Sequence, residues 1–236
     1  EPQCFVPEDL LPRRPPRSRD AYLLSETEIQ AILQAARALP PPGSLRPKTC
    51  ATLFGLLYTT GLRCGEAFAL NLSEVNLADR VLFIQKGKFG KSRWVPISAS
   101  TAGALERYLE ERSRAAPPTP QSPLFITRNA GRLYHTTVER AFRQVLERCG
   151  LRGGKGCPGP RLHHLRHSFA CNRLLAWYRE GKDVNALLPV LATYLGHVSI
   201  ASTQVYLHAS AALLEQASAR FHENFRHNIA PRGIPS

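Results

Sequence analysis

Four short segments of the sequence carry side chains that could act on a phosphate ester. Together they hold two arginines, a lysine, two histidines and a tyrosine, namely Arg63, Lys88, His163, Arg166, His197 and Tyr206. Two guanidinium groups can bind both non-bridging oxygens of a phosphodiester and neutralise the charge that develops when phosphorus is attacked. A tyrosine oxygen can attack phosphorus and later leave again, which conserves the bond energy in a covalent intermediate. These residue types therefore favour cleavage and rejoining of phosphodiester bonds, with no metal or other cofactor required.

The other three side chains could hold or move protons. Lys88 could protonate the departing 5′ oxygen, and His163 could act as base or acid toward the Tyr206 hydroxyl. His197 could donate a hydrogen bond to the phosphate. Because His163 and Arg166 are three residues apart, they would share one face of a helix.

The charge balance indicates a polyanionic partner. Lys and Arg total 31 against 18 acidic residues, which gives a net charge of +13 and an isoelectric point of about 10.0. Such a surplus is typical of proteins that bind nucleic acid, since neutralised phosphates release counterions; a merely basic globular protein is the alternative. The cations concentrate in Lys86–Arg93 and in Arg148–Arg179. We expect contacts to double-stranded DNA from four of them: Lys86, Lys91, Arg93 and Arg161.

The order and wording of the four segments resemble the tyrosine recombinase, or phage integrase, family. They read TGLRCGE at 60–66, KGKFGKSR at 86–93, HHLRH at 163–167 and LGH at 195–197, with Tyr206 nine residues after His197. The resemblance covers residues 24–208. It implies that the six residues named above are catalytic, that Glu66 and His167 orient their neighbours, and that the products are a 3′-phosphotyrosyl link and a free 5′ hydroxyl.

Two features depart from the family pattern. The family commonly has Asp where His164 stands, and the stretch 177–188 lengthens the segment between Arg166 and His197. The extra residues predict either a longer helix after Arg166 or an added loop. A metal cluster of His163, His164 and His167 is a competing interpretation, but a spaced fourth ligand is missing from the sequence and nearby arginines repel cations.

The leading functional hypothesis is a site-specific DNA recombinase or integrase of a mobile element. A type IB-like topoisomerase or resolvase would use the same chemistry, and a catalytically silent DNA-binding module is the alternative from another class. The resemblance further implies a homo-oligomer, a tetramer on DNA, assembled through the C-terminal helix; the alternative is that the leucines and Phe221 of this helix pack on the chain's own core. We expect a cytoplasmic, nucleoid-associated protein, because the apolar stretches are too short to span a bilayer.

The expected fold class is α+β, mainly helical, with one small antiparallel sheet or hairpin. Residues 1–23 form a basic Pro-rich linker, 24–208 the catalytic domain, and 209–236 a C-terminal helix and tail. Since the sequence contains no Met and lacks the family's N-terminal DNA-clamping domain, we expect a piece of a longer chain. Six cysteines without a CxxC pair favour reduced thiols.

Capping and periodicity predict the individual elements. A Ser25–Glu28 capping box should open the first helix, and Gly61 should end the second. Thr136 and Glu139 should cap a later helix. The predicted helices are 26–40, 47–60, 101–114, 136–149, 163–180, 184–194, 199–206 and 211–226. The predicted strands are 81–85 and 92–97, joined as a hairpin, and 124–127.

Overall fold

The computed structural model describes residues 22–85, 92–154, 159–197, 199–204 and 206. Lys86, Lys88 and Lys91 therefore lie outside the described residues. The same holds for residues 1–21 of the predicted linker and for the whole of the predicted C-terminal segment 209–236, including the predicted helix 211–226.

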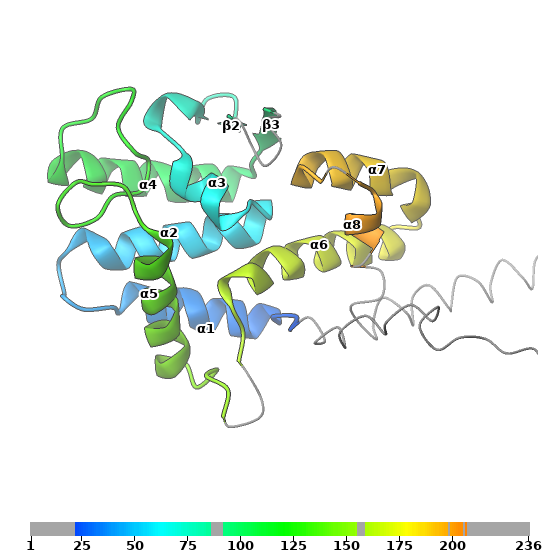
Figure 1. Cartoon of the computed structure of the whole chain (residues 1–236), viewed down its shortest axis with the longest axis horizontal. Coiled ribbons are helices and arrows are strands. Elements are labelled where there is room, and N and C mark those ends of the chain that lie inside the picture. Colours follow the sequence, from blue (N-terminus) through cyan, green and yellow to red (C-terminus); the bar gives the residue numbers. More distant parts are fainter. Residues whose placement is uncertain (1–21, 86–91, 155–158, 198, 205, 207–236) are drawn as a thin grey trace, which may run out of the picture.

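The described chain is mainly helical, as predicted (Figure 1). Its helices are α1 (Glu26–Arg37), α2 (Leu45–Thr60), α3 (Cys64–Ala69), the 3-10 helix η2 (Leu72–Glu74), α4 (Ala99–Ala115), α5 (His135–Arg148), α6 (Leu162–Arg179), α7 (Val184–Leu195) and α8 (Ala201–Gln204). Its strands are β1 (Val75–Asn76), β2 (Val81–Ile84) and β3 (Arg93–Pro96).

The sheet is antiparallel, in the order β1-β2-β3. Strands β2 and β3 pair as the predicted hairpin, with Leu82 opposite Val95 and Ile84 opposite Arg93. Strand β1 was not predicted, because two residues carry too little pattern to detect. The predicted strand at 124–127 is wrong: within this segment only Ile126 forms a bridge, with Arg132, and none of the described strands extends the pairing.

Most helix ends follow local sequence signals. The Ser25 hydroxyl accepts a hydrogen bond from the Glu28 amide, and the Glu28 carboxylate accepts one from the Ser25 amide, so the predicted capping box is confirmed. Gly61 ends α2 in the left-handed conformation, also as predicted. Helix α5 instead begins at His135, after Tyr134 and without a side-chain cap. The predicted cap by Thr136 is therefore wrong.

Two hydrophobic clusters form the interior. The first joins α1, α2, α4, α5 and the sheet, and includes the first turn of α6. The second joins the rest of α6 to α7 and Tyr206. Helix α6 runs through both, and Figure 1 shows it connecting the body around α2 to α7 and α8. We call the boundary between the two clusters the junction; the described residues of the sequence motifs meet there.

The extra residues between Arg166 and His197 form parts of two helices. Helix α6 ends at Arg179, a short turn follows, and Asp183 caps α7 by accepting hydrogen bonds from the Asn185 and Ala186 amides. Over the described ranges, no helix is long and apolar enough to cross a bilayer. The four cysteines that the structure describes, Cys50, Cys64, Cys149 and Cys171, are free thiols.

Candidate active site

Two glycine turns place the motif residues at the junction. Gly61 ends α2 with φ of 61°, two residues before Arg63, and Gly196 ends α7 with φ of 67°, immediately before His197. Glycine reaches this backbone region at little cost, whereas a Cβ atom is strained there. At Gly61 a Cβ atom would also lie 2.4 Å from the Phe169 ring, so both conformation and space require glycine.

Arg166 is the buried centre of the site. It is 2 % exposed, and its Nη1 donates to the carbonyl oxygen of Gly61 at 2.6 Å. Its Nη2 donates to the Leu195 carbonyl at 2.9 Å and to Nε2 of His197 at 2.8 Å. Arg166 thereby fixes the ends of α2 and α7 relative to each other, while its Nε remains outside these bonds.

The contact with Arg166 determines the tautomer of His197. A guanidinium group only donates, so Nε2 of His197 must accept and the ring proton must reside on Nδ1. That Nδ1 lies 2.8 Å from the Thr203 hydroxyl and donates to it. Thr203 is fully buried, and sequence analysis did not single it out because a lone Thr in a short helix carries no signal.

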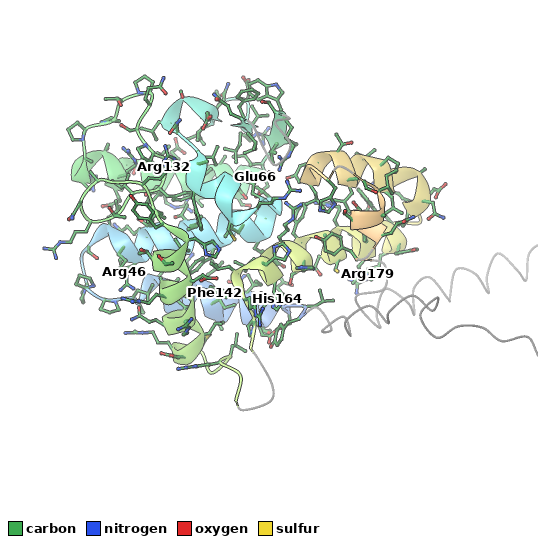
Figure 2. The ribbon with its side chains drawn as sticks, viewed as in Figure 1. Arg46, Glu66, Arg132, Phe142, His164 and Arg179 are labelled. Atoms are coloured by element: carbon green, nitrogen blue, oxygen red, sulfur yellow. The ribbon has the colours of Figure 1, made fainter. Side chains whose placement is uncertain are left out.

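Arg63 and Glu66 form a second cluster beside Arg166. Arg63 Nη2 donates to the Gly196 carbonyl at 2.7 Å, and its Nη1 donates to Glu66 at 3.0 Å. Glu66 also accepts two hydrogen bonds from Arg93, at 3.0 and 2.8 Å. Figure 2 shows Glu66 on α3, in the region where α3 approaches α7. One carboxylate thus lies between two arginines.

The rings of Tyr206, His167 and His163 follow one another in contact. The Tyr206 ring lies 5.1 Å from His167 and 6.0 Å from His197, and His167 lies 4.4 Å from His163. Tyr206 is only 4 % exposed, whereas His163 is exposed. Within the described part of the chain, Nδ1 of His167 is buried and has no hydrogen-bond partner.

Burial and the neighbouring arginines shift the pKa values of the ionisable groups in the site. Burial, and then neighbouring positive charge, lowers the pKa of His167 and of His197 to about 4. Partial desolvation and the charge of Arg166 also lower the pKa of His163. Burial acts to raise the pKa of Glu66, but hydrogen bonds from Arg93 and the Arg63 amide, with both guanidinium charges, outweigh it and lower that pKa. At neutral pH the site therefore holds neutral imidazoles and an ionised carboxylate.

Tyr206 also lies close to Arg166. Burial lowers the pKa of Arg166, while the nearby Tyr206 hydroxyl acts in the opposite direction, both by charge and by a hydrogen bond.

Arg161 and His164 lie at the start of α6. The Arg161 amide donates to Nδ1 of His164 at 3.0 Å, so His164 satisfies one of the free amides at this helix end (Figure 2). A carboxylate accepts in the same way, which explains how His can stand where the family commonly has Asp. The Arg161 side chain is exposed, and its contact with DNA stays a prediction.

The described site therefore contains seven of the residues that the sequence predicted to act at or beside the chemistry. These are Arg63, Glu66, His163, Arg166, His167, His197 and Tyr206. Lys88 lies outside the described residues, as do Lys86 and Lys91. The described residues contain no group of three or more His, Cys, Asp or Glu arranged for a metal ion, so the structure gives no support to the alternative metal cluster.

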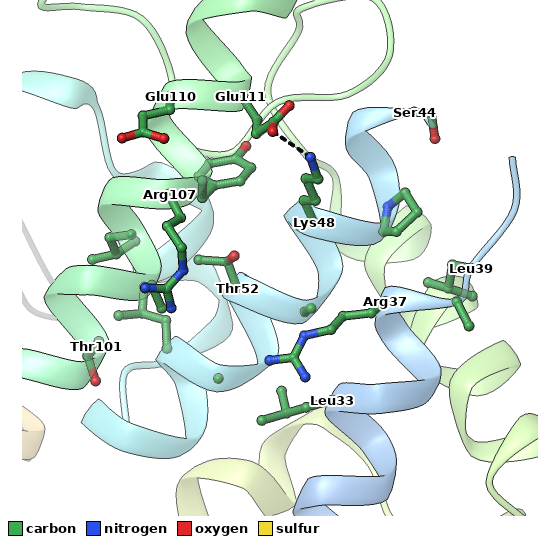
Figure 3. Close-up of a pocket in the computed structure, with 18 of the residues that line it drawn as sticks. Leu33, Arg37, Leu39, Ser44, Lys48, Thr52, Thr101, Arg107, Glu110 and Glu111 are labelled. Carbon is green, nitrogen blue, oxygen red and sulfur yellow. Dashed lines mark ion pairs between the residues drawn. The ribbon is translucent and has the colours of Figure 1, made fainter. Parts of the chain in front are cut away.

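A large groove of about 790 Å³ lies elsewhere, between α1, α2 and α4 (Figure 3). Leu33, Leu56 and Leu105 contribute to its wall, and Arg37 and Arg107 extend toward it. It contains none of the motif residues, so the candidate site is the junction and not this groove.

Comparison with known proteins agrees with this geometry. The model of the phage integrase family matches residues 23–212. Protein y4rB of Sinorhizobium fredii (strain NBRC 101917 / NGR234), named an integrase/recombinase, is 45 % identical over 91 % of this chain and 69 % of its own length. The tyrosine recombinase XerC of Roseiflexus sp. (strain RS-1) is 34 % identical over 80 % of this chain and 56 % of its own length.

A solved structure shares the fold. The site-specific recombinase XerH, in a post-cleavage complex with its palindromic difH substrate, aligns with a TM-score of 0.64 and 23 % identity, over 85 % of this chain and 52 % of XerH. The chain thus spans between about half and two thirds of the length of these proteins. On its motifs, its fold and the family match, the chain belongs to the phage integrase family, the tyrosine recombinases, which are enzymes that break and rejoin DNA.

Proposed function

We propose that this chain is the catalytic part of a site-specific recombinase or integrase of a mobile element, and that it cuts and rejoins double-stranded DNA through Tyr206. One observation carries the proposal: the Tyr206 ring contacts His167 and His197, and Arg166 binds the same His197 at 2.8 Å. A nucleophile, a buried guanidinium and two imidazoles thus occupy one site. The integrase/recombinase name of the y4rB relative supports the assignment to DNA integration or recombination.

In the proposed reaction, Arg63 and Arg166 bind the non-bridging oxygens of the phosphate and stabilise the charge of the pentavalent transition state. The Tyr206 oxygen forms a bond to phosphorus as its proton passes to His163. The bond from phosphorus to the 5′ oxygen breaks, and Lys88 supplies the proton that makes this oxygen a hydroxyl. Rejoining is the reverse: a 5′ hydroxyl attacks the phosphotyrosine and releases the phenol.

The site has to open before a DNA phosphate can bind in it. Arg166 is 2 % exposed and Tyr206 is 4 % exposed, so a DNA phosphate cannot reach either one without movement. Tyr206 packs on the second hydrophobic cluster, and the His197–Thr203 bond restrains the segment ahead of it. We infer that DNA binding displaces this segment and exchanges the internal partners of Arg166 for phosphate oxygens.

The proposed partner is double-stranded DNA. The chain would bind it as a homo-oligomer whose protomers associate through the C-terminal segment 209–236. A tetramer would align two duplexes for exchange, and the protein would act at the nucleoid in the cytoplasm. The solved XerH complex shows a recombinase of this fold on a palindromic site, which supports a symmetric assembly.

A trapping experiment tests the function. The probe is a pool of nicked duplexes with randomised central sequences, in which the short 5′-hydroxyl product diffuses away and leaves protein joined to DNA. We expect a covalent adduct with the wild-type chain and none with Tyr206→Phe. Tyr134→Phe, at an exposed tyrosine away from the site, is the matched control and should form the adduct normally.

Three results would overturn the proposal. DNA binding without any adduct would indicate a silent binding module. An adduct that persists in Tyr206→Phe would point to another nucleophile. Relaxation of supercoiled plasmid by the chain, with no exchange between duplexes, would favour a topoisomerase.

A further inference from the structure

Arg93 is almost enclosed at the junction, although it belongs to the most basic segment of the sequence. Its side chain is 12 % exposed. Nη1 and Nη2 each donate to one oxygen of Glu66, at 3.0 and 2.8 Å, and Nε donates to the Tyr194 carbonyl at 2.8 Å. All three nitrogens are therefore engaged within the protein, on α3 and on α7.

Strand alternation explains why Arg93 points inward. Strand β3 buries Val95 completely and leaves Trp94 63 % exposed. Because side chains alternate between the faces of a strand, Arg93 shares the buried face with Val95. Ile84, its partner across the hairpin, is also buried. The backbone thus directs this arginine toward the junction.

The groups that accept hydrogen bonds from Arg93 are linked in turn to the predicted catalytic residues. Glu66 also accepts from the amide and Nη1 of Arg63, both at 3.0 Å. Arg63 in turn donates to the Gly196 carbonyl, next to His197. Tyr194 binds β3 a second time, since its hydroxyl donates to the Pro96 carbonyl at 3.2 Å. Arg93, Glu66, Arg63 and the end of α7 therefore form a closed ring of hydrogen bonds.

We propose that Arg93 is a positioning residue for DNA strand transfer: it holds Glu66 and the C-terminal turn of α7 at one spacing, and thereby sets Arg63 relative to His197. The inference rests on the function proposed above. Three directed contacts from one planar group suit Arg, whereas a Lys ammonium cannot make the paired contact with Glu66 and also reach Tyr194 in the same way.

Packing at Gly196 supports the same role. A Cβ atom there would lie 2.8 Å from Nη1 of Arg93 and 2.9 Å from its Cζ. Although an arginine end can usually move aside, this one is held by Glu66 and Tyr194. The turn that presents His197 therefore rests directly on the Arg93 guanidinium.

The test separates positioning from direct DNA contact. Arg93→Gln, Arg93→Lys and Glu66→Gln are each measured for duplex affinity at several salt concentrations, and for the single-turnover rate of adduct formation at saturating nicked-duplex pool. Arg46→Gln is the matched control, because Arg46 also joins a carbonyl and a distant side chain, those of Pro40 and Gln144, away from the junction.

We expect Arg93→Gln to slow adduct formation about 100-fold, the effect of a displacement of about 1 Å in catalytic groups. Affinity and its salt dependence should stay at wild-type values. Arg93→Lys should remain slow, the Arg93→Gln/Glu66→Gln double variant should be no slower than the worse single variant, and Arg46→Gln should react normally.

Two results would overturn the proposal. If Arg93 contacts DNA directly, as the sequence predicted, Arg93→Gln weakens affinity and reduces the salt slope by about one phosphate contact while the saturated rate is normal. If Arg93→Lys reacts at the wild-type rate of adduct formation, a positive charge at position 93 is sufficient for activity and the three directed hydrogen bonds are not needed. Failure of the proposed function appears separately, as absence of a Tyr206-dependent adduct in the wild type. In that case the free energy of unfolding in urea still tests the ring of hydrogen bonds. Additive effects of Arg93→Gln and Glu66→Gln on this free energy would refute the ring.

Discussion

Gly61→Ala offers a quantitative test of how the junction is packed. The substitution places a Cβ atom 2.4 Å from Cδ1 of Phe169 and 2.9 Å from Cδ2 of Leu195, at a residue with φ of 61°. The left-handed backbone costs an alanine about 1–2 kcal/mol. Forcing a methyl group into a packed interior costs about 1–3 kcal/mol more. The free energy of unfolding should therefore fall by about 2–5 kcal/mol.

Gly43→Ala isolates the packing contribution. Gly43 has φ of 74°, but a Cβ atom there would meet no atom within 4 Å, so this variant carries only the backbone cost. Urea denaturation of both variants should show that Gly61→Ala loses about 1–3 kcal/mol more than Gly43→Ala. The effects of Gly61→Ala and Phe169→Ala should be non-additive, since the double variant no longer contains the contact with the Phe169 ring and keeps only the one with Leu195.

The same variant should also affect catalysis. The Gly61 carbonyl accepts from Arg166 at 2.6 Å, so movement of this turn displaces the central arginine. Adduct formation with the nicked-duplex pool should slow in Gly61→Ala and stay normal in Gly43→Ala. Equal losses of stability in the two glycine variants would refute the described packing of α2 against α6 and α7.

Two further predictions concern His197. Thr203→Val removes the acceptor of its Nδ1 proton and should cost about 1–3 kcal/mol of unfolding free energy in urea, whereas Thr203→Ser keeps the hydroxyl and should cost less; equal losses would contradict the hydrogen bond between His197 and Thr203. Because the folded pKa of His167 and of His197 is about 4, against an ordinary value of 6.5, the unfolded chain binds more protons between these values, and the free energy of unfolding should rise with pH across that window. His197→Asn should flatten the rise in urea titrations at a series of pH values, and an unchanged slope would count against the lowered pKa of His197.

Phosphate chemistry restricts the residue types, and the resemblance to the family selected their positions; the structure brings seven of these residues together at the junction, while Lys88 lies outside the described residues. The sequence did not predict their hydrogen bonds. The predicted helices 163–180 and 184–194 place the turn between α6 and α7 close to where the structure has it, and the Asp183 cap is a local signal for the start of α7. Which group the Leu195 carbonyl meets depends instead on how α7 packs against α6 and β3, and that contact has no local signal in the sequence.

Arg93 illustrates what charge alone conceals. As one of four cations in Lys86–Arg93, it is predicted from the sequence to contact DNA. Alternation along β3 already argued against a contact with DNA. An apolar Val at position 95 indicates a buried face, and position 93 lies on the same face. A cation on a buried face needs an anion, and Glu66, next to the first motif arginine, was the available carboxylate. The position of a cation in the alternation along a strand therefore distinguishes a side chain that faces solvent from one that faces the site. The local density of positive charge does not make this distinction.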